Sequence, residues 1–511
     1  MRSKKAFKNT MWGFVYAAVV LICGFILPRL ILTSFGSSYN GITSTIAQFL
    51  EVISLFQAGI GAVTMAALYR PLAQNDINQI SIIMKTTERY MRKIALIFVG
   101  FSILIACTLP FIIKEFDYLF TASLVIIMSF STFVQYFFGL TYQFLLSADQ
   151  MNRFMHIVNA VKVIANTVIS AILIKAGFGI HGVKLGAMVV FVIAPIFVYV
   201  HVRKKYKLIN DVRPDNNTIN QRWDNFGIQV ADFVSMNTDL VLISIFSDMK
   251  IASVYTIYSM VIKGVFGLFT PFVQGVGSAF GNMLVKNETD LLKKNLRLYE
   301  QVVFGLSTFL FGVAAAMILS FVGIYTKKIF DVNYFQPVFA YVFILAIYFK
   351  AIRYPYGGLI VVAGHFKQNR NLAFVEAGMN IVLSATLIIK FGLAGVVIGT
   401  LCAAIFRTIR YAIYASTNLV PRSNWLFVRR LALSLTVLAV IAILPYILSL
   451  TNPSGYVEWV LYAVIISSVA IILIFLTELI FYRKDLGNLS KMLMGIFSKH
   501  NPKRRTNPNI S

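Results

Sequence analysis

The chain has 511 residues, of which 58% are hydrophobic and only 13% are charged, and its mean hydropathy is +0.76. Soluble domains carry about 25% charged residues, so this composition excludes an ordinary soluble protein. Backbone groups in a bilayer core have no water to bond, and long apolar runs favour helices over the alternating strands of a barrel. The sequence therefore predicts an all-α integral membrane protein.

The net charge of +26 invites the hypothesis of nucleic-acid binding, but the positions of Lys and Arg argue against it. These residues gather in the short stretches between alternate apolar runs, which is the pattern of cytoplasmic loops in membrane proteins. We therefore expect both termini on the cytoplasmic side of a bacterial plasma membrane, and no nucleic-acid partner. The basic tail around Lys503–Arg505 is suited to contact anionic lipid heads.

The apolar runs, taken in chain order, predict about fourteen transmembrane helices. They lie at 11–33, 41–69, 94–113, 119–147, 157–174, 183–202, 225–246, 252–284, 299–324, 337–362, 372–390, 395–416, 431–450 and 458–482. The longest polar connection follows the sixth span and is predicted to link two halves. We expect an N-terminal six-helix lobe at 1–202, a cytoplasmic linker at 203–224, a C-terminal six-helix lobe at 225–416, two additional spans within 417–482 and a basic cytoplasmic tail at 483–511.

A short internal sequence repeat indicates that the two six-helix lobes are related. The segment Phe178–Gly186 aligns without a gap with Phe391–Gly399, and each segment joins two predicted spans. Because six is an even number, both halves would enter the membrane in the same orientation. This predicts a parallel repeat about an axis along the membrane normal, as in several transporter folds.

Motifs for covalent chemistry are missing from the sequence. It has no GxxxxGK[ST] phosphate loop, its five histidines make no HExxH spacing, and its three cysteines all fall within apolar spans. This pattern favours transport over catalysis, so we expect no enzyme activity, no cofactor and no firmly assigned metal. A membrane-embedded polysaccharide polymerase or ligase is the enzyme alternative, but the predicted outside loops are too short for a large active site.

Several basic residues fall inside predicted spans, where charges are costly and usually face a cavity or a partner, and five of them are candidates for a binding site. They are Arg29, Lys162, Lys263, Lys350 and Arg353. Lys350 and Arg353 are three residues apart and so share a helix face. Together the five predict a cationic cavity that attracts a pyrophosphate or an acidic sugar. The alternative is that Arg29 and Lys162 snorkel to an interface or pair with Glu51.

Acids and an amide form a second group of candidates. Asp232 and Asp239 lie seven residues apart on almost the same face of span seven, and Glu376 and Asn380 lie four apart in span eleven. Acid and amide oxygens inside a bundle are suited to bind a proton or a small cation for coupling. A structural ion pair or polar packing between spans is the alternative.

Two segments carry a family resemblance. The first runs from Phe35 to Gly41 and continues through Ala58–Gly61 and Leu68–Ala73, and the second runs from Ala363 to Leu393. They resemble bacterial polysaccharide repeat-unit flippases of the multidrug/oligosaccharidyl-lipid/polysaccharide exporter superfamily. The resemblance implies two six-helix lobes around a central cavity. It also implies transfer of undecaprenyl-diphosphate-linked oligosaccharides between leaflets for capsule or O-antigen synthesis.

The same resemblance implies a site for a coupling ion. Related flippases draw a sodium site from spans seven, eleven and twelve, which adds Thr400 to the four polar candidates named above. Gln57 departs from the family pattern, which has an acid at that position. The implied partners are the lipid-linked oligosaccharide, membrane lipids, Na+ or H+, and a polysaccharide polymerase with its glycosyltransferases.

These observations lead to the expectation of a flippase that works by alternating access, coupled to a cation gradient or the membrane potential. A cationic face would hold the diphosphate while the lipid tail stays in the bilayer between the lobes. A multidrug cation antiporter of the same superfamily is the main alternative. It would favour an acidic, aromatic cavity, whereas basic candidates outnumber acidic ones inside these spans.

Overall fold

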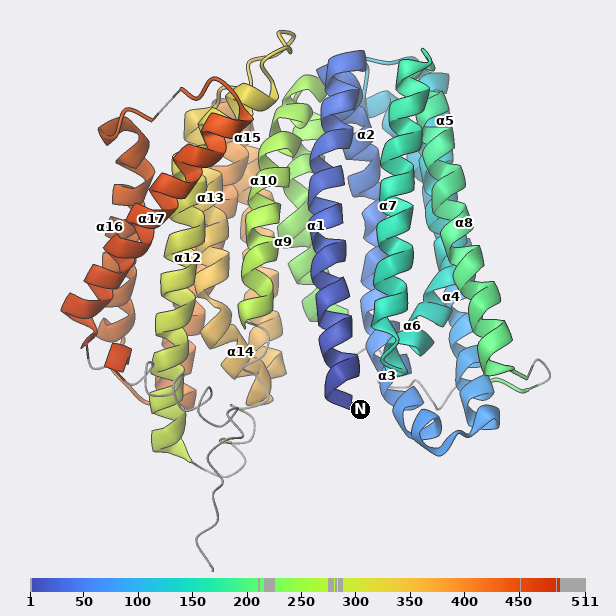
Figure 1. Cartoon of the computed structure of the whole chain (residues 1–511), viewed down its shortest axis with the longest axis horizontal. Coiled ribbons are helices and arrows are strands. Elements are labelled where there is room, and N and C mark those ends of the chain that lie inside the picture. Colours follow the sequence, from blue (N-terminus) through green and yellow to red (C-terminus); the bar gives the residue numbers. More distant parts are fainter. Residues whose placement is uncertain are drawn as a thin grey trace, which may run out of the picture. The chain divides into compact units, whose positions relative to one another are not determined.

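The apolar runs fold as α-helices in the computed structural model of the chain (Figure 1). The model describes residues 2–209, 212–215, 226–273, 280, 283, 288–450, 452–483 and 485–487. The first helices are α1 (Arg2–Phe35), α2 (Ser37–Leu50), α3 (Ser54–Gln74), α4 (Ile77–Ile112), α5 (Tyr118–Val134), α6 (Leu140–Ala148), α7 (Asn152–Lys175) and α8 (Ile180–Tyr206). The later helices are α9 (Phe226–Phe246), α10 (Met249–Val273), α12 (Thr289–Tyr325), α13 (Pro337–Ile352), α14 (Tyr354–Val362), α15 (Phe366–Tyr414), α16 (Trp425–Ile447) and α17 (Tyr456–Phe481).

Eleven helices in the described part of the chain are long and apolar enough to cross a membrane. The chain is therefore a multi-pass membrane protein, but the predicted count of fourteen spans is not confirmed. Two predicted spans, 372–390 and 395–416, fall within α15, which kinks at Gly392 (φ 55°, ψ −135°). The predicted spans at 41–69 and 225–246 correspond to α2 with α3 and to α9, which are not among the eleven.

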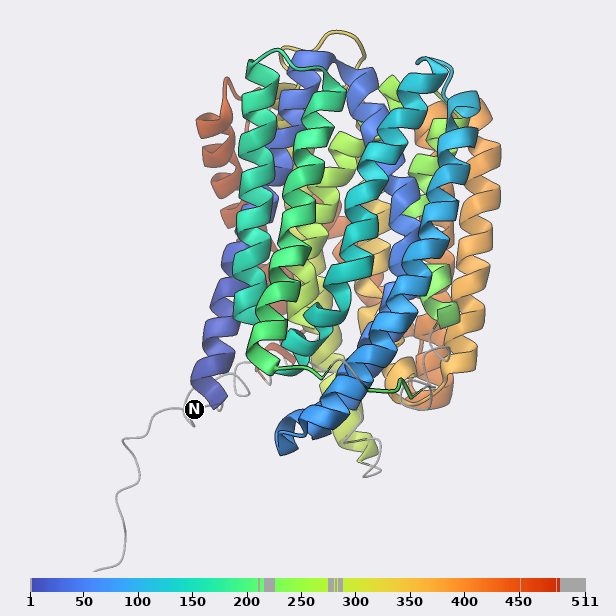
Figure 2. The ribbon, with the colours of Figure 1, turned by 90° about the vertical axis from the view of Figure 1, so that its right-hand side faces the viewer.

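Some helices continue well beyond the apolar run that predicted them. The span predicted at 94–113 is only the second half of α4, which begins at Ile77, and α12 likewise begins at Thr289 before its predicted span. A helix of 36 residues is about 54 Å long at 1.5 Å per residue, whereas a bilayer core is only about 30 Å thick. Figure 2 shows the hairpin between α3 and α4 projecting past the ends of α6 and α8. Hydropathy therefore located the apolar part of α4 and missed its polar first turns.

The chain forms two compact units that differ from the two halves of the sequence. Unit 1 contains Met1–Met260, Tyr325–Tyr334 and Ala373–Gly399, and unit 2 contains Val261–Ile324, Phe335–Leu372 and Thr400–Ser511. Thus α9, the first part of α10 and much of α15 belong to unit 1 although they come from the second half of the sequence. The domain boundaries expected at 202, 224, 416 and 482 remain predictions.

Unit 1 is a layered set of helices in which α1 runs beside α7, α7 beside α8, and α5 between α4 and α8 (Figures 1 and 2). One apolar core of this unit joins α2, α4 and α5 through residues such as Ile46, Phe98 and Leu124. Met249 at the start of α10 belongs to the same core. Because lipid is as apolar as these side chains, close van der Waals packing and interhelical hydrogen bonds hold such helices together.

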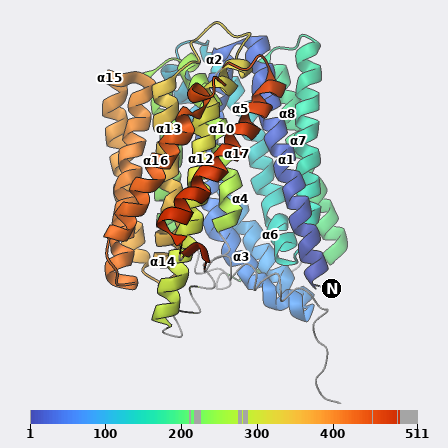
Figure 3. The same cartoon turned by 60° about the vertical axis from the view of Figure 1, so that its left-hand side comes forward.

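Unit 2 contains the last two spans, α16 and α17, which pack on α12 through Met317, Ile441 and Ile466. Figure 3 shows α17 crossing obliquely over α12 and α16. In the same unit, the span predicted at 337–362 is divided at Arg353 into α13 and α14. Pro355 is the second residue of α14, where its missing N–H and its ring prevent continuation of the preceding hydrogen-bond ladder.

Helix starts recur along the chain with a nearly constant offset. An offset of 212 residues separates Ser37 from Met249, the first residues of α2 and α10, and the same offset separates Ile77 from Thr289. Irregular turns recur as well, because a π-helical turn at Gln135–Gly139 precedes α6 and the break at Arg353 precedes α14. A constant offset of this kind is expected if the second six-helix segment of the chain is a duplicate of the first.

Candidate functional site

One face of α2 carries polar side chains that bond to later parts of unit 1. The Asn40 Nδ2 donates to Ser253 Oγ at 2.8 Å. The hydroxyls of Thr45 and Ser244 lie 2.8 Å apart, and Gln48 Nε2 donates to Asn237 Oδ1 at 2.6 Å. We call this set the α2 polar seam, which comprises Ser37, Asn40, Thr45 and Gln48 on α2 with Asn237, Ser244, Ser253, Asp331 and Tyr334.

The first turn of α2 forms the end of the seam. The backbone N–H of Ser37 donates to Asp331 Oδ2 at 2.7 Å, and its hydroxyl donates to Oδ1 at 2.6 Å. The Tyr334 hydroxyl lies 2.8 Å from Ser37 Oγ and 2.9 Å from Ser253 Oγ. Burial raises the pKa of Tyr334, so this hydroxyl stays protonated and can donate to either serine. Five polar side chains thus form one continuous chain of hydrogen bonds.

Two glycines allow the seam to close. Gly36 separates α1 from α2 with φ 92°, a backbone conformation that side chains disfavour. A Cβ on Gly41 would lie only 1.9 Å from the carbonyl oxygen of Met249, so α2 approaches α10 more closely there than any larger residue permits. These two positions give a physical reason for the glycines in the segment Phe35–Gly41.

The chemistry of the seam suits a contact that opens and re-forms. Apart from the exposed Asp331, every side chain in it is neutral. A neutral hydrogen bond contributes about 1 kcal/mol net, because water replaces the lost partner once the surface is wet. The seam connects α2, from the first half of the sequence, to α9, α10 and the 325–334 segment, from the second half.

The acidic candidates lie nearby on α9 and α15, which also belong to unit 1. Small residues bring these helices together, since Ala231 on α9 packs with Ala373 and Ala377 on α15. Glu376 and Asn380 are fully buried. Asp239 is 3% exposed and accepts a hydrogen bond from the Tyr255 hydroxyl at 3.5 Å, whereas Asp232 is half-buried.

Thr400 is buried as well, but it belongs to unit 2, directly after the end of the unit 1 part of α15. Among the described residues, no group of three His, Cys, Asp or Glu side chains could hold a metal ion. The structure therefore places two buried acidic or amide positions, Glu376 and Asn380, on one helix against the helix that carries Asp232 and Asp239. Whether a cation binds there stays a prediction.

The five basic candidates divide between the two units. In unit 1, the Arg29 guanidinium lies 5.7 Å from the centre of the Tyr325 ring, and the Lys162 Nζ lies 5.2 Å from the centre of the Phe191 ring. Such cation–π contacts hold a charge in place at partly buried positions. Glu51, considered above as a partner for Arg29 and Lys162, instead accepts a hydrogen bond from Gln48 at 3.3 Å.

The other three basic candidates lie in unit 2 and differ in burial. Lys263 is exposed on α10, Lys350 is 2% exposed near the end of α13, and Arg353 is half-buried in the break between α13 and α14. The expected pair therefore lies at a helix junction rather than within one continuous helix. The side chain of Gln57 lies outside the described part of the chain.

Sequence reasoning missed the partners in the α2 polar seam. The available signal was the spacing of small and polar residues at 37, 41, 45 and 48, which places them on one face of a helix. A polar stripe in an apolar span indicates a helix interface, but it does not identify the partner helix.

Comparison with known proteins supports the fold. No family model matches the sequence, and neither does any curated protein. The structure is similar to lipid II flippase MurJ in an inward closed conformation, with a TM-score of 0.68 at 14% identity over 93% of this chain and 99% of that chain. A mutant of the Vibrio cholerae MATE transporter VcmN gives 0.58 at 13% identity over 83% and 99% of the two chains.

A third similar structure is an inward-facing multidrug resistance MATE family transporter of the MOP superfamily. Its TM-score is 0.55 at 14% identity, over 79% of this chain and 95% of that chain. The chain has the fold of these transporters. At such low identity the likeness establishes the fold alone, so the transported molecule must be argued from this chain's own residues.

Proposed function

We propose that this protein is an alternating-access flippase that moves undecaprenyl-diphosphate-linked oligosaccharides across the cytoplasmic membrane for cell-surface polysaccharide synthesis. The α2 polar seam is the observation that carries the proposal. Apart from Asp331 at its end, it is a neutral, hydrogen-bonded contact between segments from the two halves of the sequence, in a fold shared with a lipid II flippase. In the predicted orientation it lies towards the outer side, where it would part to release the substrate.

The basic candidates support a substrate that carries a diphosphate. Lys350 is buried and Arg353 lies at a helix junction beside it in sequence. A guanidinium presents a planar fork of donors that fits phosphate oxygens, and buried cations favour an anionic ligand. A polysaccharide polymerase and glycosyltransferases would be the partners that consume and supply the lipid-linked glycan.

The buried acids support coupling of transport to a cation. Asp239, Glu376 and Asn380 offer carboxylate and amide oxygens, the groups that bind small hard cations. Thr400, which lies beyond the kink at Gly392, stays a candidate from the sequence alone. Binding of Na+ or H+ there would change the charge between α9 and α15. Such a change is suited to bias a two-state cycle.

The same acids favour one competing function, that of a multidrug cation antiporter. In that case Asp239 and Glu376 would bind the drug or exchange it for a proton, and the structural likeness to MATE transporters agrees with this reading. The two functions differ in the charge of the transported molecule, so an assay with both substrates separates them.

The test is transfer of a fluorescent undecaprenyl-diphosphate oligosaccharide between leaflets of liposomes that contain the purified protein. We expect protein-dependent transfer that falls at least about tenfold in Arg353→Ala, because one guanidinium–phosphate contact is lost. Arg410→Ala, at an exposed arginine of α15, is the matched control and should transfer normally. If no lipid-linked glycan moves but cationic dyes are expelled against an ion gradient, the antiporter function replaces this proposal.

A further inference from the structure

A cluster of ion pairs around the buried carboxylates of Glu300 and Asp485 joins α12, α16 and the end of α17 within unit 2. Arg422 forms two hydrogen bonds to the carboxylate of Glu300, and Arg430 Nη1 donates to the same carboxylate at 3.2 Å. Arg297 Nε donates to Asp485 Oδ2 at 2.7 Å, and Arg430 Nη2 lies 4.0 Å from that oxygen. We call these five residues the Glu300 cluster. Glu300 thus binds both Arg422 and Arg430, and Asp485 lies between Arg297 and the buried Arg430.

A further arginine, Arg429, lies at the edge of the cluster with different surroundings. It is exposed, and its guanidinium lies 5.8 Å from the centre of the Phe481 ring and 5.6 Å from that of Tyr482. It forms no ion pair with any residue that the structure describes. The two aromatic rings therefore hold a positive charge in a defined place without neutralising it.

This arginine lines a small basic cavity together with four members of the cluster. The cavity is bounded by Arg297, Glu300, Arg422, Leu426, Arg429, Arg430 and Tyr482. Four arginines line this cavity with only one acid, Glu300. Asp485 is outside the lining but accepts a hydrogen bond from Arg297. The cavity therefore keeps a positive charge that an anion can neutralise.

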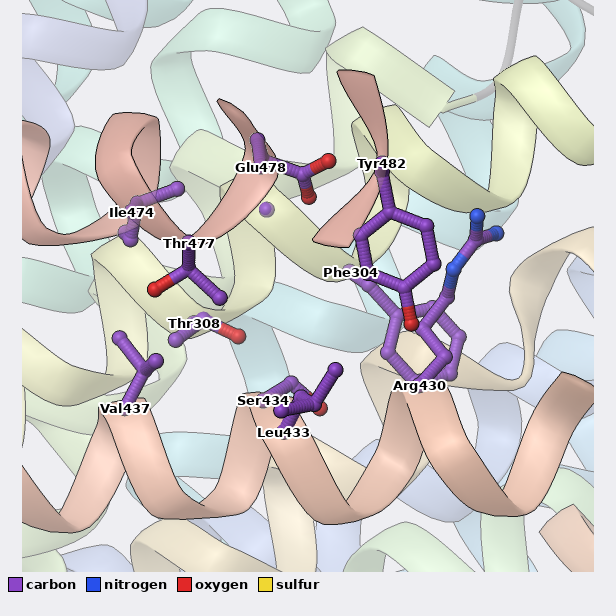
Figure 4. Close-up of a pocket in the computed structure, with 11 residues that line it drawn as sticks. Phe304, Thr308, Arg430, Leu433, Ser434, Val437, Ile474, Thr477, Glu478 and Tyr482 are labelled. Atoms are coloured by element: carbon purple, nitrogen blue, oxygen red, sulfur yellow. The ribbon is translucent and has the colours of Figure 1, made fainter. Parts of the chain in front are cut away.

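A second cavity, mostly apolar, shares Arg430 and Tyr482 with the first. Figure 4 shows its lining side chains coming from α12, α16 and α17. Phe304, Leu433, Val437 and Ile474 form its apolar walls. The Glu478 carboxylate, which accepts a hydrogen bond from Gln301 at 2.6 Å, lines it as well. A Cβ on Gly305 would meet only Ile474, at 4.0 Å, so this glycine leaves the cavity open.

The polar atoms at the junction of the two cavities indicate a missing partner. The Tyr482 side chain is 9% exposed, and its buried hydroxyl has no hydrogen-bond partner among the described residues. An orphaned buried hydroxyl costs free energy unless a ligand or water bonds to it. It lies where the basic cavity and the apolar cavity meet.

We propose that the two cavities together form a binding site for one anionic phospholipid. The phosphate would lie between Arg429, Arg430 and the Tyr482 hydroxyl, and an acyl chain would run between α12, α16 and α17. Basic pockets between membrane helices on the cytoplasmic side are suited to such headgroups. In the predicted orientation, the first turns of α12 and α16 and the end of α17 lie on that side. The proposal does not depend on which molecule the protein transports.

The test compares lipid binding to the purified, delipidated full chain by native mass spectrometry. Phosphatidylglycerol and phosphatidylcholine with identical acyl chains are titrated separately. We expect phosphatidylglycerol to bind about fivefold more tightly, since one arginine near an anionic lipid contributes about that factor. Arg429→Gln should weaken phosphatidylglycerol binding by about fivefold and remove the preference.

Two further variants make the test specific to this site. Gly305→Leu fills the apolar cavity and should weaken both lipids by about tenfold, because several buried CH2 groups lose their contacts. Arg410→Gln removes an equally exposed arginine elsewhere in unit 2 and should bind both lipids as the unmodified chain does. The melting temperature of each variant establishes that it is folded.

Several outcomes would overturn the proposal. These are equal affinities for the two lipids, unchanged binding in Arg429→Gln or Gly305→Leu, or an equal loss in Arg410→Gln. Displacement of phosphatidylglycerol by millimolar inorganic phosphate alone would show a site for a free anion. If an undecaprenyl-diphosphate oligosaccharide displaces it and Arg429→Gln also stops transport, the site belongs to the transported lipid instead.

Discussion

The α2 polar seam and the Glu300 cluster are both buried polar contacts, but they are built from opposite chemistry. The seam pairs neutral groups such as Thr45 with Ser244, whereas the cluster holds Arg422 and Arg430 on one buried carboxylate. A neutral hydrogen bond exchanges with water at a net cost of about 1 kcal/mol, while a buried charge left unpaired costs about 3–5 kcal/mol. The seam therefore suits a contact that opens in each cycle, and the cluster suits a joint that stays closed.

The buried carboxylate of Glu88 in unit 1 can be compared with that of Glu300, and the comparison shows which ion pairs are additional in the Glu300 cluster. Glu88 on α4 is buried and accepts hydrogen bonds from Arg92 at 2.7 Å and from the Tyr142 hydroxyl at 3.4 Å. Glu300 on α12 and Tyr356 on α14 occupy matching places 212 and 214 residues later. Glu300 gains Arg430 from α16, and Arg430 in turn lies near Asp485, just after the end of α17. The extra ion pairs therefore come from the part of the chain that follows the sixth helix of the second half.

The largest effect is expected for Glu300→Ala. The variant leaves two arginine side chains, 12% and 8% exposed, without their carboxylate, so stability should fall by about 3–5 kcal/mol. The measurement is the melting temperature of the purified protein. Asp290→Ala, an exposed acid on the same helix, is the control and should melt within a few degrees of the unmodified chain. A Glu300→Ala protein with an unchanged melting temperature would show that the cluster is not a structural joint.

The next effect is expected for Gly41→Ala in the seam. The added methyl group would overlap the Met249 carbonyl, so α2 and α10 must separate, at a cost of about 1–3 kcal/mol. We expect slower lipid transfer in liposomes because the closed form of the seam is destabilised.

Gly24→Ala provides the matched control for this substitution. A Cβ at Gly24 meets nothing within 4 Å, so the same methyl group should leave transfer unchanged. Equal transfer by the Gly41 variant would contradict a role for seam closure in the cycle.

A smaller loss of stability is expected for Glu88→Ala. Arg92 is 43% exposed and can be hydrated when its partner is removed, so the loss should be about 1 kcal/mol. The same melting experiment measures it beside Glu300→Ala. A loss as large as that of Glu300→Ala would show that exposure of the arginine does not decide the difference between the two contacts.

The smallest effect is expected for Thr45→Val. This variant removes one neutral hydrogen bond, while the Ser244 hydroxyl keeps its bond to the Leu240 carbonyl at 2.7 Å. Stability should fall by no more than about 1 kcal/mol, and the melting temperature should change accordingly little. A loss of several kcal/mol would show that the seam is a fixed structural contact and not one that opens and re-forms in each cycle.

The candidate site was only partly accessible to sequence reasoning. Glu376 and Asn380 were identified because polar residues are conspicuous in an apolar span, and the structure buries both of them. Glu300 lies at the start of a predicted span, where an acid looks like an ordinary interfacial charge. Its importance comes from Arg422 and Arg430, which the chain reaches more than 120 residues later.

The sequence by itself determined that this is a helical membrane protein and where most of its apolar helices lie. Each such helix follows from a local property, namely an apolar run long enough to cross the bilayer with all its backbone groups bonded internally. Only the tertiary structure decided that Ser37 meets Asp331, 294 residues away, and that Arg297 meets Asp485, 188 residues away. Such pairs depend on how helices pack against one another, and helix packing is set by the shapes of whole faces rather than by any local run of residues.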